Sequence, residues 1–156
     1  MNWFVNNREV IKNLSINTGT SSAKEFTSLC TTSEVGLTTD LEEKDFYVFC
    51  DAIKRSLVTG AKLSIDCTVK IDMNNSAIVS VLGNIHSLIK DGEVAQFNNI
   101  LVQFELLEKV SDSVLTYKKY EVPVVMKFSD LGGASEDEGE FALEMAINGK
   151  GTVVQS

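Results

Sequence analysis

The chain has 156 residues, which suits a single domain over residues 1–156 with a substantial core. Hydrophobic residues make up 44% and charged residues 23%, a typical globular composition that argues against disorder. A net charge of −8 disfavours specific binding to nucleic acid or to an anionic membrane, and no apolar run is long enough to span a bilayer.

The first part of the chain is predicted to be extended and then helical. Residues 9–16 favour a short strand, residues 18–22 a loop, and residues 26–38, rich in Thr, Ser and Val, one or two extended segments. Thr39 and Glu42 form a candidate capping box, and Gly60 suits a helix end. An apolar stripe with helical spacing lies between them and predicts a helix over residues 41–58. The stripe consists of Phe46, Phe49, Cys50, Ile53 and Leu57.

Residues 61–72 then alternate strictly and predict a strand with one face in the core and one in water. The inward set is Leu63, Ile65, Cys67, Val69 and Ile71. The outward set is Lys62, Ser64, Asp66, Thr68, Lys70 and Asp72. Residues 74–92 return to a helical period, and Gly92 can end that helix.

The remaining chain is predicted to be mostly strands. Residues 100–106, 120–128 and 141–147 alternate between apolar and polar side chains, and residues 152–154 can return after a turn at Asn148-Gly149. Pro123 has no amide hydrogen and should lie on an edge or at a bulge. Residues 129–140 are rich in glycine and carboxylates, which predicts a flexible acidic loop.

These elements predict a mainly β protein with two helices, of the α+β class. Because most strands have one polar face, we expect antiparallel pairing in a β-sandwich or partly open barrel with a flanking helix. Long strands of this kind present edges that can pair with another chain.

No motif in the sequence indicates catalysis, a cofactor or a metal. The chain has three cysteines, which is an odd number, and none of them forms a CxxC pair; they are Cys30, Cys50 and Cys67. Neither a disulfide framework nor a zinc site is therefore predicted. His86 is the only histidine, and its place near the apolar helix face predicts a partly buried structural role. Phosphate-binding glycine loops and calcium loops are absent.

Several segments resemble the tail-tube (major tail) proteins of long-tailed bacteriophages. They are the Ser56-Leu57-Val58-Thr59-Gly60 segment, the alternating strand over residues 61–72 and the helix up to Gly92. The strand around Phe97-Asn98-Asn99-Ile100 and the closing stretch from Glu140-Phe141-Ala142-Leu143 to Asn148-Gly149 are also similar. The resemblance covers residues 26–154, and the two predicted helices exceed the one prominent helix often seen in that family.

The resemblance implies a virion protein, made in the bacterial host cytoplasm, that functions in the phage tail and is not an enzyme. Its copies would form hexameric rings that stack into a tube and join other phage tail proteins, and genomic DNA would pass through without specific binding. Family bores are typically acidic, and a charge of −8 per copy fits, since like charge disfavours adsorption of DNA. A terminator or baseplate ring protein and a small partner-binding β-sandwich are the alternatives.

Two sets of residues are candidates for assembly contacts. The outward strand positions could line the bore or contact a neighbouring subunit; they are Lys62, Ser64, Asp66, Thr68 and Lys70. The acidic loop could contact the adjacent ring and become ordered on assembly, or remain a disordered surface loop; its charged residues are Asp130, Glu136, Asp137, Glu138 and Glu140.

Overall fold

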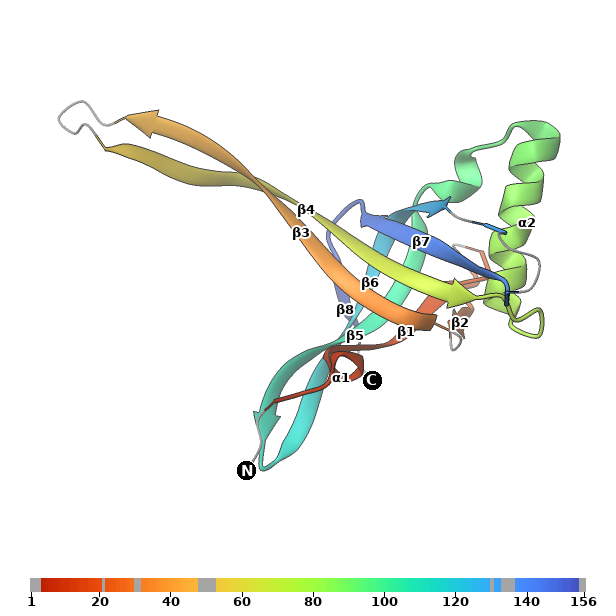
Figure 1. Cartoon of the computed structure of the whole chain (residues 1–156), viewed down its shortest axis with the longest axis horizontal. Helices are drawn as coiled ribbons and strands as arrows, with labels where there is room; N and C mark the ends of the chain where they lie inside the picture. The colour runs from red at the N-terminus through yellow and green to blue at the C-terminus, as the bar shows by residue number, and fades with distance from the viewer. Residues whose placement is uncertain are drawn as a thin grey trace.

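The computed structural model describes residues 4–20, 22–29, 32–47, 53–129, 131–132 and 137–154 (Figure 1). In chain order the elements are α1 (Asn7–Val10), β1 (Ile11–Asn17), β2 (Phe26–Ser28), β3 (Thr32–Tyr47), β4 (Lys54–Lys70), α2 (Ser76–Asp91), the 3-10 helix η1 (Ala95–Phe97), β5 (Ile100–Ser111), β6 (Val114–Ser129), β7 (Glu140–Ile147) and β8 (Thr152–Val154).

The strands form one antiparallel sheet that does not close. Its order is β2-β1-β5-β6-β7-β4-β3, with β8 added to β6, so β2 and β3 are the free edges of the described sheet. Strands β1 and β3 both line a cleft of about 1100 Å³, so the sheet curls toward closure and leaves a gap. The predicted mainly β, antiparallel fold with a flanking helix is confirmed, in its partly open form and with one curled sheet.

Alternating side chains of the central strands form the core on one face of the sheet. The inward prediction for β4 is confirmed at Ile65, Cys67 and Val69, which are buried. Their fully buried neighbours across the sheet come from β7, β6, β5 and the helix; they are Phe141, Leu143, Met145, Val124, Val102, Ile78 and Val81. Because one face of the sheet packs on this core, the opposite face is turned toward solvent.

Helix α2 covers part of the core and begins and ends close to its predicted limits. The Asn75 side chain accepts a hydrogen bond from the Ala77 amide at 2.9 Å, and its own amide donates to the Ser28 carbonyl on β2. Gly92 adopts a left-handed conformation and donates to the Leu88 carbonyl. The expected partial burial of His86 is wrong, because its side chain points from the exposed side of the helix.

The helix predicted over residues 41–58 is wrong, because residues 41–47 lie in β3 and residues 54–58 lie in β4. Thr39 and Glu42 lie inside β3, so they do not cap a helix. A β-bulge between the pairs Glu42–Gly60 and Glu43–Val58 inserts one extra residue in β4 and breaks the two-residue alternation. Pairing between the two strands overrides the helical spacing of the apolar stripe. Two members of the predicted stripe, Phe49 and Cys50, lie outside the described residues.

Pro123 lies in the central strand β6, not on an edge. It pairs with Leu101 of β5 on one side, and its carbonyl accepts from the Asn148 amide on the other. In an antiparallel ladder the nitrogen and oxygen of one residue face the same neighbour. The missing amide of Pro123 therefore faces the turn where the partner of β6 changes from β8 to β7, and the ladder with β5 stays intact.

Candidate assembly surfaces

The outer half of the β3–β4 hairpin projects far from the body of the molecule (Figure 1). We call residues 41–47 and 53–61 the arm. The two strands of the arm pair with each other, and no other strand of the described chain pairs with them. Large apolar side chains are exposed along the arm; they are Leu41, Phe46, Tyr47, Ile53, Leu57 and Val58.

The solvent side of the sheet body is polar, and we call it the polar face. The predicted set on β4 lies there: Lys62, Asp66 and Lys70 are exposed, and Ser64 and Thr68 are half-buried. The register places further charged residues on the same face; the whole charged set is Glu34, Asp40, Asp66, Glu105, Glu121, Glu140, Glu144, Lys12, Lys62, Lys70, Lys119 and Lys127.

Most directly paired charges on the polar face are opposite in sign, as in the pairs Asp40–Lys62, Lys70–Glu140 and Glu105–Lys119, whereas Asp66 and Glu144 form one acidic pair. Asp66, Glu144 and Lys127 lie side by side on β4, β7 and β6. Asp66 also accepts a hydrogen bond from the Thr38 hydroxyl at 2.8 Å. None of the large apolar side chains found exposed in the described chain lies on this face of the sheet body. The polar face therefore suits continuous contact with water.

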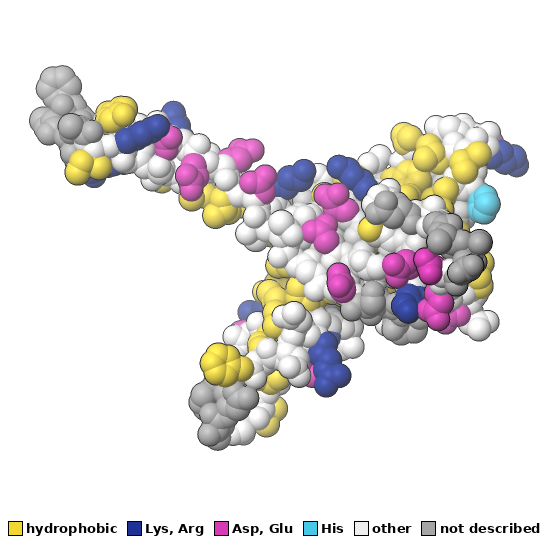
Figure 2. All heavy atoms as spheres, viewed as in Figure 1, with side chains coloured by type: hydrophobic (Ala, Val, Ile, Leu, Met, Phe, Trp, Pro, Cys, Tyr) yellow, Lys and Arg dark blue, Asp and Glu magenta, His cyan; other side chains and the backbone are white. Residues whose placement is uncertain are grey.

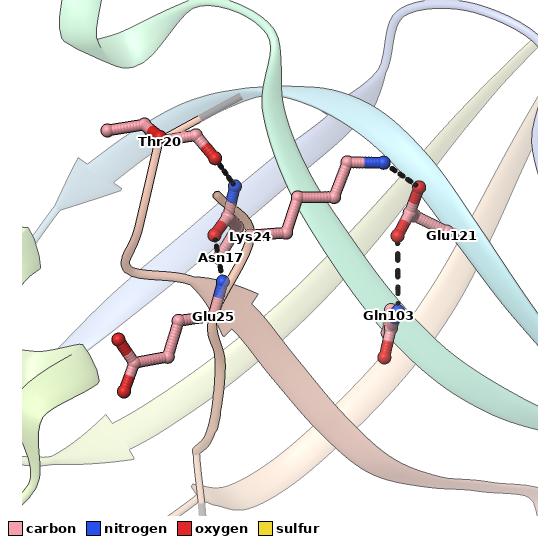
Figure 3. Close-up of polar contacts among 6 residues, drawn as sticks. All are labelled: Asn17, Thr20, Lys24, Glu25, Gln103 and Glu121. Atoms are coloured by element: carbon pink, nitrogen blue, oxygen red, sulfur yellow. Dashed lines mark hydrogen bonds and ion pairs between the residues drawn. The ribbon is translucent and has the colours of Figure 1, made fainter. Parts of the chain in front are cut away.

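A hydrogen-bonded network at one edge of the polar face fastens a loop to the sheet (Figure 3). The two oxygens of Glu121 on β6 accept from Lys24 and from the side-chain amide of Gln103 on β5, each at 3.1 Å. Gln103 is buried and the Glu121 side chain is only 15% exposed. Asn17 shapes the same loop, since its side chain accepts from the Glu25 amide and donates to the Thr20 carbonyl.

The sequence contains no local signal for this network. Alternation places Glu121 on the polar face, but its partner Gln103 is 18 positions away and Lys24 is 97 positions away. The pairing of β5 with β6 brings Gln103 to Glu121, and Lys24 reaches Glu121 from the segment between β1 and β2.

The two predicted sets of site residues meet at Lys70. Its ammonium group donates to Glu138 at 2.8 Å, and Lys70 lies opposite Glu140 in the β4–β7 ladder. The hydrogen bond, with charge attraction, raises the pKa of Lys70 and lowers that of Glu138. Asp137 is also described and is exposed, whereas Asp130 and Glu136 lie outside the described residues.

The end of α2 opposite the arm carries a second apolar surface. Leu88, Ile89 and Val94 are exposed there, and we call them the helix-end patch. Figure 2 shows hydrophobic side chains gathered over this end of the molecule and, separately, along the arm. In the same view the arm carries interspersed acidic and basic side chains.

The described residues contain no group of three or more metal-ligating side chains of the His, Cys, Asp and Glu types. Burial, with a contribution from Asp66, raises the pKa of the Cys67 thiol to about 12, so this buried cysteine is a poor nucleophile near neutral pH. Among the described helices, none is both long enough and apolar enough to cross a membrane.

Comparison with known proteins identifies the fold. No protein-family model matches the chain, and no curated protein matches it. A chain of the native gene transfer agent virion matches with a TM-score of 0.56 at 14% identity, over 92% of this chain and 96% of the other. A chain of the empty gene transfer agent tail, refined with C6 helical symmetry, matches with a TM-score of 0.50 at 13% identity, over 97% and 100% of the two chains.

A third match comes from the tail tube of phage SPP1. Its TM-score is 0.55 at 12% identity, over 90% of this chain and 74% of the tail-tube chain. The protein therefore has the fold of chains that build phage-type tails. This finding confirms at the level of fold the tail-tube resemblance seen in the sequence.

Proposed function

We propose that this protein is a structural, non-enzymatic subunit of a phage tail that polymerises into a tube. The observation that carries the proposal is the arm, a long two-stranded ribbon with exposed apolar side chains, on a fold shared with tail chains. An isolated two-stranded hairpin is at best marginally stable in water, so the arm requires a covering surface. In a polymer, neighbouring copies supply that surface.

In the proposed tube the copies form hexameric rings that stack, and the bore conducts DNA during delivery to the host. We assign the polar face to the bore. The described residues of this face include no exposed large apolar group, whereas the arm and the helix side carry such groups. Among the described residues of the polar face, acidic side chains outnumber basic ones by seven to five, and this small negative excess disfavours adsorption of a polyanion.

The second set of predicted contacts lies at the β4–β7 end of the body. Lys70 and Glu138 join the described part of the acidic loop to the sheet, so the exposed carboxylates Asp137 and Glu138 are presented from a fixed base. We propose that this end contacts the adjacent ring or another tail protein. In the virion, the protein would be located in the tail together with the other phage tail proteins.

Negative-stain electron microscopy of the purified protein over a concentration series tests the proposed function. Tubes, or stacks of rings with sixfold views, are expected as the concentration rises. Discrete rings that never stack would favour a terminator or baseplate role. A monomer at every concentration would contradict self-assembly and favour a small binding module.

Substitution on the polar face tests its assignment to the bore. Asp66→Lys combined with Glu144→Lys should leave tubes intact and make them retain added DNA, because the bore would become basic. Glu108→Lys, an exposed position on the β5–β6 hairpin, is the control and should not increase retention. Equal retention by both variants would contradict the assignment.

A further inference from the structure

The turn between β7 and β8 contains the pair Asn148-Gly149. Asn148 is the only asparagine of the chain that a glycine follows. An asparagine side chain can react with the backbone nitrogen of the next residue, because ring closure between them gives a five-membered succinimide. Glycine favours this closure, since it has no Cβ to hinder the approach of its nitrogen. The turn therefore holds the two residue types that this reaction needs.

Both reacting groups of the pair are open to water. Asn148, Gly149 and Lys150 are all exposed. The side-chain amide of Asn148 donates a hydrogen bond to Asn99 Oδ1 at 3.2 Å, and Asn99 is exposed as well. This contact holds the nitrogen that would leave, not the carbon that would be attacked. Water can replace such an exposed hydrogen bond, so the contact offers little resistance.

The backbone nitrogen of Gly149 is not held by a hydrogen bond. Among the described residues, no acceptor contacts the Gly149 amide, and Gly149 lies outside the strands. The neighbouring amide, that of Asn148, donates to the Pro123 carbonyl at 2.8 Å. The nitrogen of Gly149 must lose its proton before it attacks, and a hydrogen bond from its amide would oppose that loss. The turn is thus fixed at Asn148 and free at the nucleophile.

A second pair, Asp91-Gly92, has related chemistry but is restrained by the fold. Asp91 is the last residue of α2, so the helix fixes its backbone. The Gly92 amide donates to the Leu88 carbonyl at 3.0 Å and closes the helix. The nitrogen that would attack the Asp91 side chain is therefore already engaged. The fold leaves the pair at residues 148–149 reactive and restrains the pair at residues 91–92.

We infer that Asn148 is a site of spontaneous deamidation in the folded subunit, with water as the co-reactant. The Gly149 nitrogen gives its proton to hydroxide and forms a bond to Cγ of Asn148. The side-chain nitrogen of Asn148 takes a proton from water and leaves as ammonia. Water then adds to either carbonyl of the succinimide and opens the ring to aspartate or isoaspartate. In total one water is consumed and one ammonia is released, and nothing is oxidised or reduced.

The reaction changes the turn that carries β8. It adds one negative charge to the net −8 of the chain, and it removes the donor to Asn99. Isoaspartate also inserts one additional carbon into the backbone between residues 148 and 149. Among the described strands, β8 pairs only with β6. Hydrogen exchange of the β8 amides should therefore become faster as the product accumulates, and unchanged exchange would contradict this effect.

Peptide mapping of free subunits incubated at pH 8 measures the reaction, which requires the folded subunit and no assembly. Trypsin cleaves after Lys127 and Lys150, and the fragment between them contains Asn148 as its only asparagine and no glutamine. The mass gain of deamidation in this fragment therefore reports on Asn148 alone. It should appear in the folded subunit at a rate less than tenfold below the rate in urea. Protection above tenfold, which is about 1.4 kcal/mol in the barrier, would overturn the inference.

Two variants provide the controls. Asn148→Gln keeps a side-chain amide but would close a six-membered ring, which forms far more slowly, so the mass gain should disappear; an unchanged gain would overturn the inference. Asp91→Asn creates a second Asn-Gly pair, at the end of α2, where the Gly92 amide is engaged with Leu88. In the folded variant residue 91 should deamidate at least tenfold more slowly than Asn148. Equal rates at the two positions would overturn the selection of Asn148 by the fold.

Discussion

Removal of the Glu121 carboxylate tests how strongly the network in Figure 3 holds the loop that carries Lys24 to the sheet. The Glu121→Ala substitution removes two interactions of different value. The ion pair with Lys24, whose side chain is 44% exposed, contributes about 0–1 kcal/mol. Loss of the acceptor leaves the buried Gln103 amide unpaired, at a cost of about 1–3 kcal/mol.

The free energy of unfolding should therefore fall by about 1–4 kcal/mol in the Glu121→Ala variant. Each kcal/mol lost lowers the melting temperature by roughly 2–4 °C in a domain of this size. Urea unfolding of free subunits, followed by circular dichroism below the concentration of assembly, measures the change. Glu121→Gln should lose less, because its amide oxygen can still accept from Gln103.

Glu108→Ala is the matched control. Glu108 forms an ion pair with Lys118 at 3.7 Å, and both side chains are close to half exposed. Its removal should change the free energy of unfolding by no more than about 0.5 kcal/mol. Equal losses in Glu121→Ala and Glu108→Ala would refute the argument that burial of Gln103 gives the network its value.

Three further predictions concern single residues. Cys67 should react with a thiol reagent at pH 8 far more slowly in the folded subunit than in urea, and equal labelling rates would contradict its burial. Because folding raises the pKa of Cys67 from 9.0 to about 12, the contribution of this thiol to stability is present below pH 9 and is lost as the pH rises toward 12. Gly151→Ala should destabilise the protein by about 1–3 kcal/mol, because the added carbon would lie 2.7 Å from the Val122 side chain. Gly83→Ala, in open space on α2, should stabilise the protein by roughly 0.5–1 kcal/mol. Thermal melts that rank the two variants the other way would be inconsistent with the packing. The carboxyl of Glu138 should titrate below its ordinary pKa of 4.5 in a carbon-detected NMR series, and a midpoint at or above 4.5 would count against its ion pair with Lys70. This ion pair therefore stabilises the folded state above pH 4.5, and the stabilisation is lost as the pH falls.

The sequence by itself determined the elements whose periods are regular. The alternation over residues 61–72 identified a strand, and the helical period over residues 74–92 with Gly92 identified α2 almost to its ends. In both cases one face packs on the core, so hydrophobic spacing reports the local geometry directly. The same alternation placed Lys62, Asp66 and Lys70 on the solvent side.

Only the tertiary structure decided the arm. The apolar stripe between Phe46 and Leu57 has a helical spacing, although residues 41–47 lie in β3 and residues 54–58 lie in β4. Pairing with the other strand of the hairpin overrides that local signal. The contacts that fasten Lys24 to Glu121 and Lys70 to Glu138 likewise depend on strand order, because they join positions 97 and 68 residues apart. Periodicity reports which face of an element is buried, whereas the partner of each element follows from long-range pairing in the folded chain.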